Sequence, residues 1–128
     1  MKVVCNSSPL VNLSRIGRIY ILKQLYTELL IPKAVYQEVV INGRGMPGAY
    51  EISRSNWITT RDVNDQRQVR ILSYDLDLGE SETIVLALEV NADFLIMDER
   101  LGREMARHLD LVFTGTIGVL IEAKSVKS

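Results

Sequence analysis

Asn6 and Asp98 are the residues of this sequence whose type and position first indicate chemistry. Each ends an apolar run, Val3-Val4-Cys5 before Asn6 and residues 92–97 before Asp98. Apolar runs of this kind are typical of buried parallel strands, and ligands of parallel sheets bind beyond the carboxyl ends of the strands. The two side chains are therefore expected at one edge of a sheet, where core packing does not explain them.

Two glutamates are candidates for the same place. Glu80 begins a strongly apolar helical segment, with Ile84 and Ala87 one and two turns further on its face. Glu38 reaches the same edge if its helix packs beside the first strand. Carboxylate and amide oxygens without histidine or cysteine partners suit Mg²⁺ or Mn²⁺ and metal-assisted hydrolysis of a phosphodiester.

Each of these acids also has a purely structural explanation. Asp98 could cap the helix that follows it, and Glu80 could favour the dipole of its own helix. Glu38 alone would be a solvated side chain. Glu82 competes with Glu80 because it shares the helix start, and periodicity alone does not decide between them.

The surrounding sequence predicts an α/β domain in which strands alternate with crossover helices. Ser8 is expected to cap the first helix, with Pro9 at its first position. The last helix, residues 114–124, is expected to turn Ile117, Leu120 and Ile121 inward. Strands are expected at residues 2–6, 29–31, 57–60, 92–97 and 111–113, and the other helices near residues 20–26, 32–42, 66–72, 79–90 and 99–108.

Composition narrows the class of protein. The chain has 128 residues, the size of one domain, so a single domain over residues 1–128 is expected. Cys5 is its only cysteine, which excludes an intrachain disulfide and suits a reducing cytoplasm. No signal-peptide core or membrane-length apolar stretch is present, and the net charge of -1 does not draw the whole chain to nucleic acid.

Polar side chains near the acids are candidates for substrate contact. Arg100, Arg103 and Arg107 share one helix face and could clamp the phosphates of a substrate, although acidic neighbours dilute the patch. Thr114 and Thr116 stand at the end of the last strand, where a helix cap is the alternative role. Ser8 could position a ligand or a water.

Three segments of the chain resemble PIN-domain proteins, specifically the branch related to VapC-type toxins. They are Val3-Val4-Cys5-Asn6-Ser7-Ser8-Pro9-Leu10, Leu78-Gly79-Glu80-Ser81-Glu82 running to Ala87, and Ala92-Asp93-Phe94-Leu95-Ile96-Met97-Asp98. The resemblance implies a three-layer α/β/α fold with a mainly parallel sheet of about five strands. It places Glu38 on the second acidic position, Glu80 rather than Glu82 on the third, and Ser8 on a small hydroxyl position.

The resemblance also implies a function. The expected activity is that of a Mg²⁺- or Mn²⁺-dependent ribonuclease with Asn6, Glu38, Glu80 and Asp98 as catalytic metal ligands. RNA is the expected substrate, an antitoxin protein the expected partner, and a homodimer the expected assembly.

Two departures from the family pattern favour a second hypothesis. Asn6 stands where the family usually has aspartate, and Arg100 where it often has a further acid, with Glu99 as a possible substitute. The alternative is a catalytically impaired PIN-like scaffold that binds protein or RNA.

Overall fold

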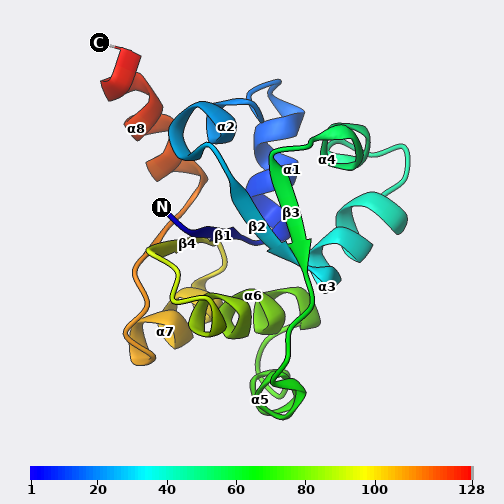
Figure 1. Cartoon of the computed structure of the whole chain (residues 1–128), viewed down its shortest axis with the longest axis vertical. Helices are drawn as coiled ribbons and strands as arrows, with labels where there is room; N and C mark the ends of the chain where they lie inside the picture. The colour runs from blue at the N-terminus through cyan, green and yellow to red at the C-terminus, as the bar shows by residue number, and fades with distance from the viewer. Residues whose placement is uncertain (128) are drawn as a thin grey trace.

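The computed structural model describes residues 1–127 and contains one five-stranded parallel sheet (Figure 1). Its strands are β1 (Val3–Cys5), β2 (Leu29–Pro32), β3 (Ile58–Arg61), β4 (Phe94–Ile96) and β5 (Phe113–Thr114). They lie in the order β3-β2-β1-β4-β5, and every neighbouring pair is parallel. The expected α/β class and parallel sheet are confirmed.

Helices fill every connection between strands, as crossovers of a parallel sheet require. The helices are α1 (Ser7–Arg15), α2 (Ile21–Tyr26), α3 (Lys33–Tyr36), the π-helical turn η1 (Gln37–Ile41), α4 (Ala49–Arg54), α5 (Gln66–Leu72), α6 (Leu78–Glu89), α7 (Arg100–His108) and α8 (Thr116–Lys127).

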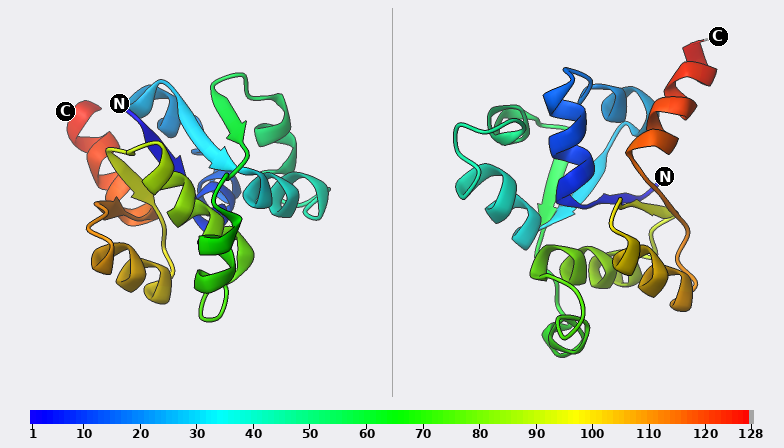
Figure 2. Two further views of the ribbon diagram at one scale, coloured as in Figure 1. Left: turned by 60° about the horizontal axis from the view of Figure 1, so that its bottom comes forward. Right: turned by 180° about the vertical axis from the view of Figure 1, so that it is seen from behind.

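The sheet separates two apolar cores, which makes three layers (Figures 1 and 2). Val3 and Cys5 face the core shared with α1, α2, η1 and α8, whereas Val4 faces the core shared with α5, α6 and α7. This alternation follows from the two-residue period of a strand. Burial raises the pKa of the Cys5 thiol, and nearby Asp98 raises it further. Cys5 is thus a buried apolar residue, in keeping with its place in the apolar run that ends at Asn6.

The first helix begins earlier than the sequence predicts. Asn6 is the residue before the helix, Ser7 is its first residue and Pro9 its third. The prediction that Ser8 caps α1 is therefore wrong. Local propensity gives no signal for this earlier start. β1 ends at Cys5, and the Asn6 N–H donates to the carbonyl of Ile96 in β4 at 2.9 Å, so the helix can begin at the next residue.

The last helix is rotated relative to the prediction. Val119 and Ala123 are buried, whereas Ile117 is 69% and Ile121 is 62% exposed, so the inward face predicted for these two isoleucines is wrong. Leu120 packs partly against the core, as predicted. The start of α8 is bound to the sheet edge through Asp98, and the Tyr26 hydroxyl donates to Glu122 further along the helix, so contacts with distant segments accompany this orientation.

The topology changes direction between β1 and β4. Chain order runs outward from β1 through β2 to β3, then returns across α5 and α6 to β4 on the other side of β1. Ligands of open α/β sheets bind where adjacent connections diverge in this way. Asn6 follows β1 and Asp98 lies two residues after β4, so both stand at this position.

Within the described residues, the structure holds no helix with the length and apolar character needed to cross a membrane.

Candidate functional site

Three oxygen-bearing side chains surround the start of α6. Asn6 Oδ1, Glu38 Oε1 and Asp77 Oδ1 each lie 3.6 Å from the position that a β-carbon would take on Gly79. The Thr83 hydroxyl lies 2.7 Å from the carbonyl oxygen of Gly79 and 3.3 Å from Asn6 Oδ1, which fixes the amide. The glycine thus leaves a small space that an amide and two carboxylates share.

Glu80 directly follows Gly79 in the chain and is tied into the helix start. Its carboxylate accepts a hydrogen bond from the Asp77 N–H at 3.0 Å, and the Asp77 carboxylate accepts one from the Glu80 N–H at 2.8 Å. This reciprocal pair is a capping box. Glu80 therefore has the structural role considered for it, in addition to its place beside the other acids.

The electrostatics around Glu80 are those of a crowded acidic site. Burial raises the pKa of Glu80, the carboxylates of Asp77, Glu99 and Glu38 raise it further, and the hydrogen bond from Asp77 lowers it. The bonds that Asp77, Glu80 and Glu99 accept come from backbone N–H groups and a serine hydroxyl, which carry no charge. These bonds leave the negative charge of the cluster in place.

Glu38 reaches the site from the π-helical turn η1. Val35 and Val39 hold this segment against the core, and Glu38 itself is exposed. π-Helical turns are rare and occur frequently at functional sites. The sequence places Glu38 near this edge, but the wider turn that carries it has no signal in the sequence.

Asp98 is bound on both carboxylate oxygens. Oδ1 accepts the Thr116 N–H at 2.7 Å, and Oδ2 accepts the Thr116 hydroxyl at 2.6 Å and the Asn12 amide at 3.2 Å. Asp98 thus caps α8, two elements further along the chain than the helix the sequence indicated. These bonds join β4, α1 and α8 at the sheet edge.

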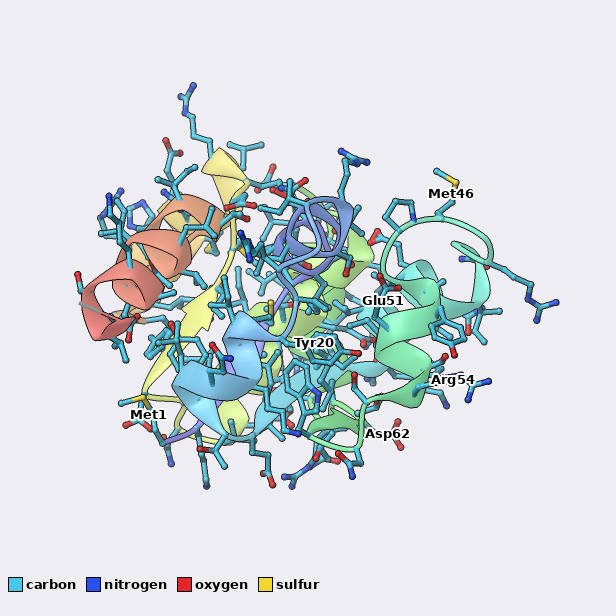
Figure 3. The ribbon with its side chains drawn as sticks, turned by 90° about the horizontal axis from the view of Figure 1, so that it is seen from above. Met1, Tyr20, Met46, Glu51, Arg54 and Asp62 are labelled. Atoms are coloured by element: carbon cyan, nitrogen blue, oxygen red, sulfur yellow. The ribbon has the colours of Figure 1, made fainter. Side chains whose placement is uncertain are left out.

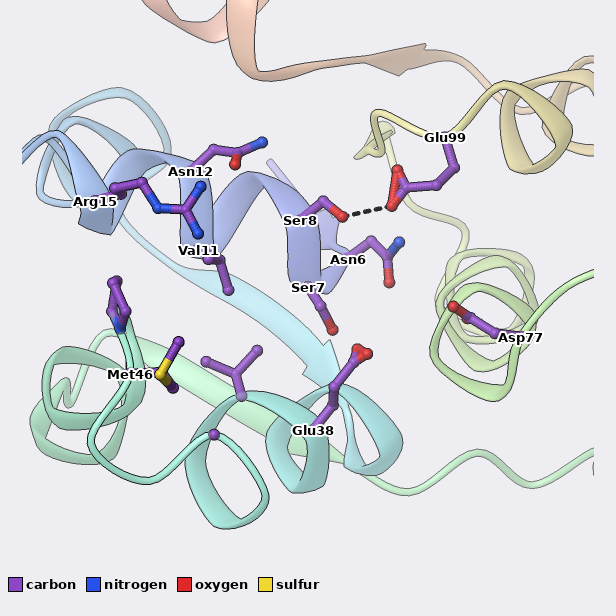
Figure 4. A pocket seen from close by; sticks show the side chains of 13 residues that line it. Asn6, Ser7, Ser8, Val11, Asn12, Arg15, Glu38, Met46, Asp77 and Glu99 are labelled. Atoms are coloured by element: carbon purple, nitrogen blue, oxygen red, sulfur yellow. Dashed lines mark hydrogen bonds between the residues drawn. The ribbon is translucent and has the colours of Figure 1, made fainter.

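Ser8 and Glu99 form a second link across the site. The Ser8 hydroxyl donates to Glu99 Oε1, as Figure 4 shows, and connects α1 to the residue before α7. Ser7 is 8% exposed, and its hydroxyl has no hydrogen-bond partner in the described part of the chain. Figure 4 shows the Ser7 hydroxyl pointing toward the Glu38 carboxylate. Glu82 faces elsewhere and accepts the Ala34 N–H at 2.9 Å.

A pocket of about 370 Å³ opens over these groups (Figure 4). Asp77, Glu38 and Glu99 lie at one end, and Arg15 lies at the other. Between them the wall is partly apolar, including Val11 and Met46; Met46 belongs to a loop that stands out from the body of the molecule (Figure 3). The pocket therefore joins an acidic end to a basic one.

The residues predicted to contact substrate lie at different distances from this pocket. Ser8 lines it. Thr116 contacts Asp98, and Thr114 lies at the end of β5. Arg103 donates to the Met97 carbonyl at 2.8 Å and lies over the Phe113 ring.

The arginine face of α7 is divided among these partners. Arg107 also lies over the Phe113 ring, and exposed Arg100 pairs with Glu104 at 3.3 Å. In this arrangement the guanidinium of Arg103 serves the structure of the sheet edge. Contact of these residues with substrate stays a prediction.

Sequence reasoning missed Asp77, Asn12 and Arg15. Asp77 precedes Gly79-Glu80, and its spacing of three from Glu80 is the signature of a capping box, which could have identified it. Asn12 and Arg15 lie three residues apart on α1, so one face carries both. Nothing in the sequence separates that face from a solvated one.

The oxygen donors present suit a divalent cation. Among residues 1–127, no three His, Cys, Asp or Glu side chains are grouped so that they could hold a metal ion. The space beside Gly79 combines two carboxylates with an amide oxygen, and the unpartnered Ser7 hydroxyl lines the same pocket. Mg²⁺ is usually held by one or two carboxylates and keeps several waters, so this donor set fits Mg²⁺ or Mn²⁺.

The pKa of Glu80 predicts a pH-dependent effect of Glu80→Gln. A raised pKa makes ionisation of Glu80 costlier in the folded chain than in the unfolded one. This penalty is absent below the unfolded value, about pH 4, and complete above the folded value. Glutamine stays neutral and can still accept the Asp77 N–H. We expect the variant to melt a few degrees above wild type at pH 7 and level with it below about pH 4.

Thermal unfolding followed by circular dichroism in chelator, from pH 4 to pH 8, measures this difference. A variant that is less stable than wild type at pH 7, with the gap closing toward acid, would contradict the crowded acidic site around Glu80.

Comparison with known proteins agrees with the fold. A family model described as a PIN domain matches residues 2–128. A similar solved structure is that of a PilT N-terminus domain protein from the hyperthermophilic archaeon Sulfolobus solfataricus P2. Its TM-score is 0.67 at 19% sequence identity, over 96% of this chain and 93% of that one. At this identity the likeness shows the fold alone. No curated protein sequence matches the chain.

Proposed function

Because the chain belongs to the PIN-domain family, whose members are generally nucleases, we propose that it is a Mg²⁺- or Mn²⁺-dependent ribonuclease. The observation that carries the proposal is the uncompensated acidic cluster at the sheet edge. The carboxylates of Glu38, Asp77 and Glu99 raise the pKa of buried Glu80. The amide oxygen of Asn6 lies beside Gly79 together with oxygens of Glu38 and Asp77. Such a cluster is costly unless a cation or a proton relieves it.

The chain's own residues would hold the cation and the scissile phosphate. Asn6, Glu38 and Asp77 are the proposed direct ligands. Glu80, which follows Gly79, and Asp98, whose oxygens bind Thr116 and Asn12, are the acids expected from the sequence, and we propose that they hold the cation through water. A bound cation would neutralise charge on the phosphate and lower the pKa of an attacking water. Asp98 would also keep α1 and α8 in place through Asn12 and Thr116.

Phosphate binding beside the acids needs a positive group, and Arg15 is the basic side chain that lines the same pocket. Asn12, from the same face of α1, contributes amide hydrogens near Asp98. We propose that these two residues position the RNA backbone, with Ser8 and Thr116 as further contacts. Arg100 and Arg103 stay predicted contacts that would need new side-chain positions.

Asp98→Asn tests the function directly. The amide oxygen of asparagine can still accept the Thr116 N–H, but its NH2 group would face the Thr116 hydroxyl and the Asn12 amide, which now donate to Oδ2. The melting temperature of the variant is therefore measured beside its cleavage rate, to separate loss of charge from loss of structure. Defined RNAs incubated with purified protein and Mn²⁺ should be cut by wild type. Cleavage should fall roughly a hundredfold or more in the variant and stop in chelator.

Asp93→Asn is the matched control, since Asp93 lies at the opposite end of β4 and binds the Lys2 N–H. Its cleavage rate should equal that of wild type. Equal cleavage by wild type and Asp98→Asn would point to a contaminating nuclease and remove the proposed function.

A PIN-like scaffold that binds RNA or protein without cutting is the second candidate function. It is favoured by Asn6, which supplies an amide where the resemblance expects a carboxylate, and by Arg100 in place of a further acid. RNA binding without Mn²⁺-dependent cleavage by wild type would support this candidate over the nuclease.

The resemblance to VapC-type toxins further supports a toxin role, with an antitoxin protein as partner and a homodimer as assembly. Exposed Ile117 and Ile121 on α8 offer apolar surface for a protein contact. Growth arrest on expression of wild type but not of Asp98→Asn would support the toxin role.

A further inference from the structure

Two further hollows lie beside the acidic pocket on the surface. A second hollow, of about 300 Å³, shares Glu38 and Asp77 with the acidic pocket. A third, of about 690 Å³ beside α5, shares Leu78 with the second. The three hollows are thus neighbours in one row across the surface, with Arg15 lining the first and α5 lining the last, and this row is called the track below.

The last part of the track combines basic and aromatic side chains. Arg67 and Arg70 lie three residues apart on α5, and Tyr74, just beyond the helix, is 89% exposed. Ile71 and Leu78 add exposed apolar surface beside them. No Asp or Glu is among the described residues that line this hollow. Figure 1 shows α5 at the margin of the molecule, beneath α6.

Charge along the track alternates in a way that suits a polyanion. Arg15 stands at one end, the acids in the middle, and Arg67 and Arg70 at the other end. A nucleic-acid backbone would meet cations on both sides of the acidic centre. An exposed aromatic ring next to such cations is the combination with which proteins hold unpaired bases, because any base can stack on it.

We infer that this track binds single-stranded RNA, with a base stacked on Tyr74 and flanking phosphates on Arg67 and Arg70. The assignment of RNA rests on the proposed function. The assignment of a single strand rests on the exposed ring, which a base inside a duplex does not reach.

Binding of a labelled single-stranded RNA, followed by fluorescence anisotropy, tests the inference. All variants are made in Asp98→Asn protein with Mg²⁺, so that turnover does not interfere. Tyr74→Ala should weaken binding at least about fivefold. Arg67→Gln with Arg70→Gln should also lower the salt dependence, by about 1.4 in the logarithmic slope for two phosphate contacts of about 0.7 each.

Tyr50→Ala with Arg54→Gln is the matched control. This pair is an exposed tyrosine with an arginine 4.6 Å from its ring centre, on α4. Tyr50 lines a hollow that shares no described residue with the track. Affinity should be unchanged in the control, and equal affinities of the control and Tyr74→Ala overturn the inference.

Other occupants give different results. Duplex RNA bound as tightly as the single strand overturns the single-strand assignment, and tighter binding of single-stranded DNA overturns the assignment of RNA. If Tyr74→Ala lowers the molar mass in light scattering and leaves RNA affinity unchanged, the surface is a contact between copies of the chain, and the inference is wrong.

Cleavage kinetics separate this inference from the proposed function. In otherwise wild-type protein, Tyr74→Ala should raise KM and leave kcat nearly unchanged. Normal cleavage with an unchanged KM keeps the nuclease and overturns the track. A wild type that does not cut RNA, combined with weaker RNA binding in Tyr74→Ala, removes the nuclease and supports the track.

Discussion

Replacing Gly79 by alanine is expected to abolish RNA cleavage and leave the fold intact. The new methyl group would lie 3.6 Å from Asn6 Oδ1, Glu38 Oε1 and Asp77 Oδ1, an ordinary contact distance that requires no movement. The methyl group would, however, fill the space between these oxygens. A cation bound by all three would need that same space. Cleavage should fall roughly a hundredfold or more.

Stability distinguishes this effect from misfolding. Alanine is a better helix residue than glycine, by about 0.5 kcal/mol or more, so the variant should melt at or slightly above the wild-type temperature in chelator. Mn²⁺ at a hundred times its Kd should stabilise wild type by about 2.7 kcal/mol and so raise its melting temperature. It should leave the melting temperature of the variant unchanged. Unchanged cleavage in Gly79→Ala would remove the space beside Gly79 from the proposed site.

Replacing Gly115 by alanine is expected to damage the fold and the site together. Gly115 lies between β5 and α8, and a β-carbon there would overlap the Arg103 guanidinium and stand 2.6 Å from Asp98 Oδ1. Both groups are held by hydrogen bonds, Arg103 to the Met97 carbonyl and Asp98 to Thr116. The methyl group must break at least one of them, so stability should fall by about 3 kcal/mol.

Urea unfolding measures this loss, and a double variant identifies its cause. Arg103→Ala added to Gly115→Ala removes one overlap and should recover part of the lost stability, although Arg103→Ala alone should destabilise. Additive losses in the double variant would show that the overlap with Arg103 is not the source. RNA cleavage should be lowered in Gly115→Ala because Asp98 is displaced.

Much of the architecture was predictable because it depends on short-range patterns. Apolar runs and helical periods predicted all five strands and the alternation of strands with helices, and α5 was predicted at the bounds the structure shows. The acidic edge was predictable for the same reason, since Asn6 and Asp98 each follow an apolar run. Residues outside these apolar runs and helical periods were predicted less accurately.

The predicted orientations of side chains held less well, because they depend on contacts between distant segments. The sequence treats Arg103 as one of three arginines on a helix face, and only the fold brings Phe113 and the Met97 carbonyl within its reach. The start of α8 is likewise bound by Asp98, which lies 18 residues before Thr116. Contacts between residues so far apart produce no periodic pattern in the sequence, so they could not be predicted from it.

At the site, the sequence alone determined which polar residues follow strands and which acids lie at helix starts. Apolar periodicity and capping signals are local, so they can be read without the fold. Only the tertiary structure decided that Asp77 joins Asn6 and Glu38 beside Gly79, and that Asp98 is bound by Asn12 and Thr116. The physical reason is that these groups meet where β1, α6 and η1 converge, and that convergence is set by sheet order and core packing.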